Sequence, residues 1–175
     1  MMKPEYAAIL AKSRERQTEI KRQLTHLGRF NHKNFDHIVA DYDAEVFAEI
    51  DCRECGNCCR ALGPQLKDSD IKRMAKYIGM DINEFVETRL RKDEDNDWIF
   101  IGLPCPMLED ETNLCTIYDQ RPKACENYPH TTERNIQRQL PRLAKNTEFC
   151  PAAYLIAEKI IARFAKKSDP DRDER

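Results

Sequence analysis

The sequence predicts a single α+β domain that is mostly helical, with a small antiparallel β ribbon and metal-tied loops preceded by a helical pair. Three observations lead to this fold class. The length of 175 residues is that of one ordinary domain. Apolar residues recur at helical spacing over most of the chain, and only short stretches have strand composition. Eight cysteines are more than packing needs but fewer than a disulfide-stapled miniprotein carries, which favours metal ligation.

Charge and hydropathy exclude several protein classes. Lysine and arginine number 29 against 31 aspartate and glutamate, so the chain is neither a generally basic nucleic-acid binder nor a polyacidic tail protein. The first residues lack the apolar core and cleavage site of a secretory signal, and no 18-residue apolar run is present. These features predict a cytoplasmic protein without a membrane span. A reducing cytoplasm disfavours disulfides, so the cysteines are better interpreted as metal ligands.

The amino-terminal part predicts two helices. Apolar side chains follow a helical period in residues 6–27 and again in residues 35–50, with a break at Gly28. Residues 1–33 are net basic and residues 34–59 net acidic. Two solvated helix faces that attract each other explain this pattern, and a hairpin that docks a protein partner is the alternative.

Two further helices are predicted in the middle of the chain. Asp68 can cap a helix that Gly79 ends. Asp81 and Glu84 have the spacing of a capping box, which predicts a short helix over residues 82–90.

The second half predicts a small ribbon and a carboxyl-terminal helix. Residues 98–101 have strand composition, and the acidic segment 109–113 predicts a turn between two extended pieces. Pro151 directly after Cys150 is typical of the first position of a helix. The predicted organisation is a helical pair packed on the core (1–50), a cysteine-cluster metal-binding domain with a carboxyl-terminal helix (51–165) and a charged tail (166–175).

The densest motif is Cys52-x2-Cys55-Gly56-x-Cys58-Cys59. Two thiolates separated by two residues can bind one metal ion, and a glycine after the second relieves the left-handed geometry of such a turn. We therefore expect Cys52 and Cys55 to share a metal. With Cys58 the spacing becomes C-x2-C-x2-C, which also occurs in iron–sulfur ligation. In an extended chain Cys58 and Cys59 would diverge, so one of them could serve a second site.

The other four cysteines are spread over the second half. A hairpin could bring Cys105 and Cys115 together. Cys125 is expected on a helix that begins near Asp119, and Cys150 lies at a helix amino terminus, where the macrodipole favours thiolate. Any one of these four could instead be a buried cysteine that packs like a small hydrophobic side chain. That explanation does not fit all eight cysteines of the chain.

Three spaced motifs, taken in order, carry a resemblance to a known family. They extend over more than half of the chain, from about residue 51 to residue 150. The motifs are Cys52-x2-Cys55-Gly56-x-Cys58-Cys59, Pro104-Cys105-Pro106-x-Leu108 and Cys115-x-Ile117-Tyr118-x2-Arg121-Pro122-x2-Cys125-x2-Tyr128-Pro129.

In these motifs the chain resembles the YkgJ-type cysteine-cluster proteins, the CxxCxxCC family described as zinc- or iron-chelating. Members of this family are often labelled iron–sulfur oxidoreductases, and a related cluster occurs in flagellin lysine methylases. The resemblance implies an iron–sulfur cluster or zinc as the cofactor. It also implies that the metal ligands are all eight cysteines, namely Cys52, Cys55, Cys58, Cys59, Cys105, Cys115, Cys125 and Cys150.

The sequence thus predicts a cysteine-thiolate metal-binding protein whose partner is a metal ion or cluster. The alternatives are an iron–sulfur redox or protein-modifying enzyme and a zinc-stabilised nucleic-acid or protein adaptor. Tyr118 and Arg121 are expected around the ligands, where they could hydrogen-bond thiolates or carbonyls, or bind an anionic substrate. The chain has no glycine-rich phosphate loop, nucleophile elbow or H-E-x-x-H motif, so catalytic residues are not assigned.

Overall fold

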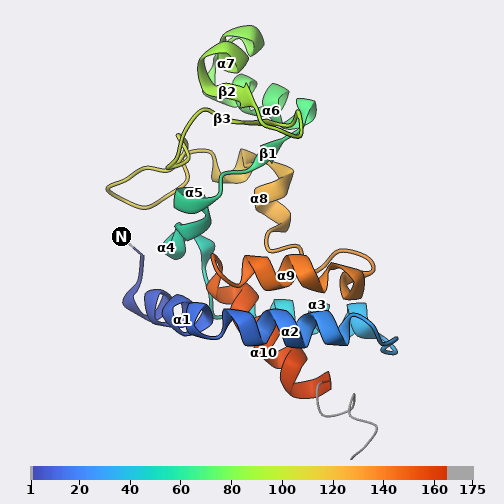
Figure 1. Ribbon diagram of the computed structural model, residues 1–175. Coiled ribbons are helices and arrows are strands. Elements are labelled where there is room, and N and C mark those ends of the chain that lie inside the picture. Colours follow the sequence, from blue (N-terminus) through green and yellow to red (C-terminus); the bar gives the residue numbers. More distant parts are fainter. Residues whose placement is uncertain (1, 165–175) are drawn as a thin grey trace, which may run out of the picture. The chain divides into compact units, whose positions relative to one another are not determined.

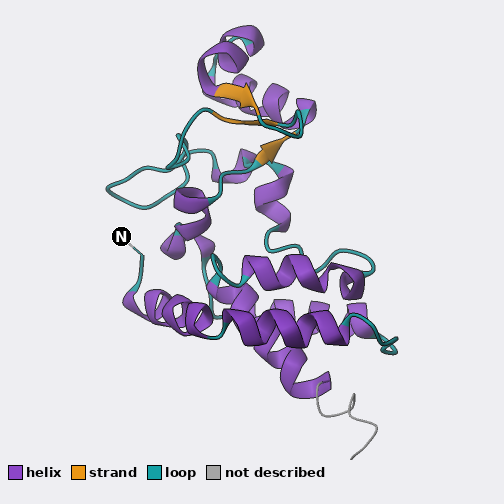
Figure 2. Ribbon diagram, viewed as in Figure 1, coloured by secondary structure: helices purple, strands orange, loops and turns teal. Residues whose placement is uncertain are grey.

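The computed structural model describes residues 2–164 and confirms a mostly helical α+β protein. These residues form ten α-helices, two short 3-10 helices and one three-stranded sheet (Figure 1). Contacts divide the chain into two units. We call residues 2–3 and 52–128 the cysteine unit, and residues 4–51 and 129–164 the helical unit. All strands lie in the cysteine unit (Figure 2).

The helical unit is built around its carboxyl-terminal helix. This helix, α10, contacts α1, α2, α3 and α9, and its buried face is continuously apolar. No helix within residues 2–164 has the length and apolar character needed to cross a bilayer. The helices are α1 (Pro4–Glu15), α2 (Gln17–Leu27), α3 (Phe35–Phe47), the 3-10 helix η2 (Ile136–Gln139), α9 (Leu140–Asn146) and α10 (Pro151–Phe164).

The first predicted helix is divided at Arg16 into α1 and α2, so the expectation of one continuous helix over residues 6–27 is wrong. The Arg16 amide donates to the carbonyls of both Lys12 (3.3 Å) and Ser13 (3.2 Å). Just before the break, the buried Ser13 hydroxyl donates to the Thr147 carbonyl (2.7 Å). The apolar period does not change phase across the division, so periodicity alone could not reveal it.

The start of α10 agrees with the sequence. Pro151 is its first residue, and the Cys150 sulfur accepts a hydrogen bond from the Ala153 amide (3.4 Å). Cys150 therefore satisfies one of the amides that a helix start leaves without a partner. The predicted charged tail, 166–175, lies outside the described residues.

The cysteine unit combines short helices with a small antiparallel sheet. The strand order is β1-β3-β2, and Trp98 of β3 lies opposite Leu66 of β1 and Lys92 of β2. The predicted strand at residues 98–101 is thus present as the central strand. The elements are α4 (Cys52–Cys55), α5 (Asn57–Ala61), β1 (Gln65–Leu66), α6 (Asp68–Ile78), α7 (Ile82–Arg89), β2 (Leu90–Lys92), β3 (Trp98–Phe100), the 3-10 helix η1 (Tyr118–Gln120) and α8 (Lys123–Asn127).

The helix ends in this unit follow local sequence rules, with one exception. The Asp81 carboxylate accepts from the amides of the first turn of α7, as its capping spacing predicts. Gly79 ends α6 in the left-handed conformation. The expectation that Asp68 caps α6 is wrong. Asp68 is the first helical residue, and the Asp70 carboxylate instead accepts from the Lys67 amide (3.0 Å).

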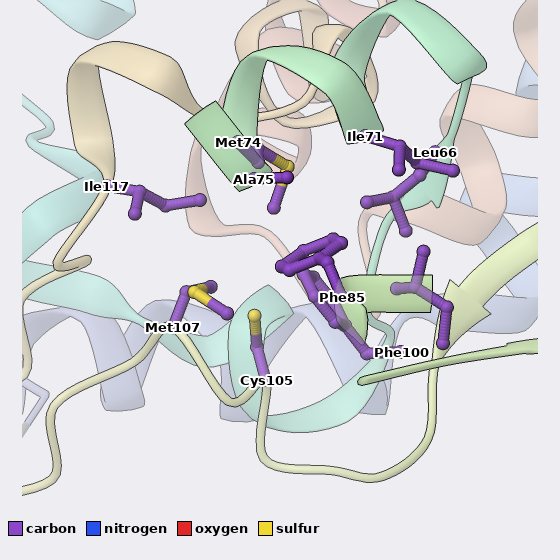
Figure 3. Close-up of a cluster of buried hydrophobic side chains, with 10 residues drawn as sticks. Leu66, Ile71, Met74, Ala75, Phe85, Phe100, Cys105, Met107 and Ile117 are labelled. Atoms are coloured by element: carbon purple, nitrogen blue, oxygen red, sulfur yellow. The ribbon is translucent and has the colours of Figure 1, made fainter. Parts of the chain in front are cut away.

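The sheet, α6 and α7 enclose an apolar cluster that reaches the cysteines. Phe85 is fully buried within the cluster, and Cys105 is one of the buried members (Figure 3). Cys59 and Cys115 are partly buried and pack against it. The buried members are Leu66, Ile71, Met74, Ala75, Phe85, Leu90, Phe100, Cys105, Met107 and Ile117.

Candidate metal centre

The first cysteines lie on a tight turn between two one-turn helices. Cys52 and Cys55 are the ends of α4, and Gly56 follows in the left-handed conformation with φ 61°, as the sequence predicts. A Cβ atom at Gly56 would lie 2.6 Å from the Asn113 Oδ1 atom. Both the left-handed backbone and the lack of space for a Cβ atom therefore favour glycine at position 56. The Cys52 side chain is exposed, whereas Cys55 is buried.

Cys58 and Cys59 lie on α5, so the expectation that their backbone is extended is wrong. The Cys58 thiol donates a hydrogen bond to the Cys59 sulfur, which lowers the pKa of Cys59, and the Arg60 charge lowers it further. The hydrogen bond from Cys58 thus favours the thiolate form of Cys59.

Backbone hydrogen bonds bring two more cysteine segments to α5 and to each other. The Cys105 amide donates to the Cys59 carbonyl (2.8 Å). Leu108 and Cys115 form an isolated antiparallel bridge, and the predicted turn at residues 109–113 closes it. Cys105 and Cys115 thus approach through a short hairpin, and the backbone at Cys105 just before it is hydrogen-bonded to α5.

Cys125 lies on the first turn of α8. This helix begins at Lys123, so the expected start near Asp119 is wrong. Asp119 belongs to the separate 3-10 helix η1, and Pro122 stands between the two elements. A residue before proline is disfavoured in the α conformation, which explains why the helix does not run through Arg121.

Four of these thiols lie close enough for the charge of one to affect the pKa of another. Burial is the largest cause and raises the pKa of Cys105 to about 11, and it also raises the pKa of Cys115 and Cys125. A negative charge on Cys59 raises the pKa of all three further. Cys105 and Cys115 add to the rise at Cys125. We call Cys59, Cys105, Cys115 and Cys125 the four-thiol group.

Burial raises the pKa of Cys55, and a charge on Cys59 raises it further. Cys55 differs from the four-thiol group in its contact with the Met2 thioether, with 3.8 Å between the two sulfurs. Cys150 belongs to the helical unit, where it caps α10. Within residues 2–164, no three histidine, cysteine, aspartate or glutamate side chains already have the spacing of a metal-ion site.

Tyr118 and Arg121, both expected around the metal, interact with each other. The Arg121 guanidinium lies over the Tyr118 ring, 4.0 Å from its centroid, and donates to the Tyr118 carbonyl (2.7 Å). The Arg121 charge lowers the pKa of Cys115 and Cys125, opposing the effect of burial. Arg121 therefore supplies positive charge close to two members of the four-thiol group.

Sequence reasoning missed Asn113, which ties the first cysteine turn to the hairpin. Asn113 is buried, donates to the Arg53 carbonyl (3.2 Å) and accepts from the Arg60 guanidinium (2.9 Å). It has a positive φ of 62°. Asparagine tolerates a positive φ better than most residues. An asparagine at the end of the predicted acidic turn was therefore the sequence signal that could have identified Asn113.

The middle of the chain matches a family model. The model of the CxxCxxCC family, described as a putative zinc- or iron-chelating domain, matches residues 51–151. All eight cysteines lie in the matched segment. No solved structure matches the chain.

Proposed function

The chain belongs to the CxxCxxCC family of zinc- or iron-chelating domains, and from this premise we propose that it binds its metal through Cys59, Cys105, Cys115 and Cys125. Thiolate-only ligation suits zinc and iron–sulfur clusters and disfavours hard ions such as magnesium and calcium. Four thiolates are also the usual complement for a structural zinc ion or a cluster.

The observation that supports this choice is the mutual influence of the four thiols. They come from four separate places in the chain, yet a charge on Cys59 raises the pKa of each of the other three, as it does that of Cys55. Backbone geometry supports the choice as well, because the Cys105 amide donates to the Cys59 carbonyl and Cys115 lies on the hairpin that follows Cys105. The Cys105 sulfur lies in the apolar cluster near Phe85 (Figure 3). An apolar wall beside the ligands limits the access of water to a bound metal.

Binding is expected to draw the sulfurs together. The thiols do not yet have the spacing of a metal site, and Zn–S bonds are about 2.3 Å long. The thiols must also lose their protons to act as ligands, and the bound cation then offsets the mutual repulsion of the resulting thiolates. We therefore propose that the metal stabilises the packing of α5, the hairpin and α8.

The other cysteines have separate roles in this proposal. Cys58 supports the Cys59 thiolate through its hydrogen bond. Cys52 and Cys55 have the spacing for a second ion, and the Met2 thioether beside Cys55 is a further soft donor. Cys150 caps α10 and is not a ligand in this proposal. The ligand set is thus narrower than the eight cysteines that the family resemblance implies.

For the identity of the metal we propose an iron–sulfur cluster in protein prepared without oxygen, with zinc able to replace it in air. The four-thiol group has the four cysteines that usually hold a [2Fe–2S] or [4Fe–4S] cluster. The C-x2-C-x2-C spacing of Cys52, Cys55 and Cys58 is also typical of cluster ligation, and it belongs to the separate site proposed for Cys52 and Cys55. Elemental analysis and acid-labile sulfide, measured on anaerobic protein with an absorption spectrum, distinguish the two. Stoichiometric zinc without sulfide in such preparations would overturn the iron–sulfur assignment.

The ligand assignment is tested by a matched pair of cysteine-to-serine variants. Cys125→Ser removes a proposed ligand and should lower the metal content. Cys150→Ser is the control, because a serine hydroxyl can also accept from the Ala153 amide and keep α10 capped. Full metal content in Cys125→Ser, or its loss in Cys150→Ser, would contradict the assignment.

A further inference from the structure

Asp70 is a buried carboxylate in the cysteine unit, with 1% of the residue exposed. It lies in the first turn of α6, and its Oδ2 atom accepts from the Lys67 amide (3.0 Å). Its Oδ1 atom accepts from the Arg73 guanidinium (2.8 Å) and from the Lys123 amide (3.2 Å). One carboxylate thus joins its own helix start to a segment 53 residues further along the chain.

The segment that Asp70 holds is the one that places Cys125. Lys123 is the first residue of α8, and Cys125 is on the same turn. The same Arg73 nitrogen that binds Asp70 also donates to the Arg121 carbonyl (2.9 Å). Residues 121 and 123 are therefore each bonded to α6, at the start of the helix that carries Cys125.

Capping α6 does not explain this arrangement. Asp81 caps α7 in the same unit from an exposed position, with two local hydrogen bonds to the next turn. Asp70 is buried instead, at a cost in desolvation, and its hydrogen bonds and ion pair offset that cost. Only one of its three hydrogen bonds serves the helix start, and the other two are directed at Arg73 and Lys123.

We propose that Asp70 is a positioning residue of the metal centre, which acts by holding α8 so that Cys125 faces the other members of the four-thiol group. Outer groups that orient metal ligands typically contribute about 10–100-fold to metal affinity. This inference rests on the proposed function, since it requires that Cys125 is a ligand.

The test uses the full chain and zinc as the probe. Asp70→Asn keeps the size of the side chain but removes the charge that Arg73 binds. Arg73→Met removes the link to the Arg121 carbonyl and is the milder change, because Arg73 is partly exposed. Asp81→Ala is the matched control, as it removes a carboxylate cap from a helix in the same unit that carries no cysteine. Zinc affinity is measured by competition with a chelator, and the alkylation of each cysteine by mass spectrometry.

In both Asp70→Asn and Arg73→Met we expect zinc affinity to fall roughly 10–100-fold, with Cys125 becoming alkylated in the zinc-loaded protein while Cys59 and Cys105 stay protected. Asp81→Ala should lower the melting temperature but keep wild-type affinity and protection. If Asp70→Asn does not fold, Arg73→Met decides the question.

Two results would overturn the inference while leaving the proposed function intact. One is wild-type affinity with Cys125 still protected in Arg73→Met. The other is an equal loss of affinity in Asp81→Ala, which would mean that destabilisation alone weakens binding. A wild-type protein that binds zinc without protecting Cys125, or that binds no zinc, would instead remove the proposed site and this inference with it.

Discussion

Replacing Gly56 by alanine should destabilise the cysteine unit more than any other single methyl group added at a glycine. A left-handed conformation costs a non-glycine residue about 1–2 kcal/mol. The new Cβ atom would also lie 2.6 Å from the Asn113 Oδ1 atom, so this buried side chain must move. Losing its bonds to Arg60 and Arg53 adds about 1–3 kcal/mol. The free energy of unfolding should therefore fall by about 2–5 kcal/mol.

Alanine substitutions at two other glycines separate the cost of the left-handed conformation from the cost of displacing Asn113. Gly79→Ala meets a positive φ of 72° but no atom within 4 Å, so only the conformational cost of about 1–2 kcal/mol applies. Gly102→Ala has neither a positive φ nor a neighbour, and should leave stability unchanged. Urea unfolding followed by Trp98 fluorescence suits all three variants, because the single tryptophan lies in the cysteine unit. Equal losses in Gly56→Ala and Gly79→Ala would refute the contribution of Asn113.

Further predictions concern the core, the helical unit and the thiols. Phe85→Ala, at a fully buried position, should cost about 3–5 kcal/mol in the Trp98 assay, and a loss below about 1 kcal/mol would show that the apolar cluster is not the core. Ser13→Ala leaves the Thr147 carbonyl without its donor and should cost about 1–3 kcal/mol by circular dichroism, without changing metal content. Burial raises the pKa of Cys105 to about 11 and also raises that of Cys125, so both thiols are protonated at neutral pH. Zinc binding should therefore release protons and tighten as pH rises, and calorimetry in buffers of different ionisation enthalpy that detects no proton release would contradict this.

Local sequence signals predicted local structure well in this chain. Asp81 capping α7, Pro151 starting α10 and Gly56 in a left-handed turn each depend on residues within one turn of the chain. Such short-range rules hold because the hydrogen bonds at a helix end or a tight turn are made by near neighbours. The type of site could also be predicted, since the number and spacing of the cysteines favour a metal bound by thiolates, such as zinc or an iron–sulfur cluster.

Contacts between distant segments could not be predicted in the same way. Asp70 resembles any first-turn acid of a helix, and only the folded chain brings it to Lys123. The pairing of Cys58 with Cys59 was missed because their backbone was taken as extended, whereas it is helical. Which cysteines gather depends on the backbone hydrogen bond from Cys105 to Cys59 of α5, and sequence spacing does not encode this bond.

The most direct test of the central claim is the rate at which each cysteine is alkylated in metal-free and in zinc-loaded wild-type protein. The ratio of the two rates removes the effect of burial, which differs from one thiol to another. The account predicts strong protection by zinc at the four-thiol group, and unchanged rates at Cys150. Protection confined to Cys52, Cys55 and Cys58, with Cys105 and Cys125 as reactive as in the metal-free protein, would contradict it.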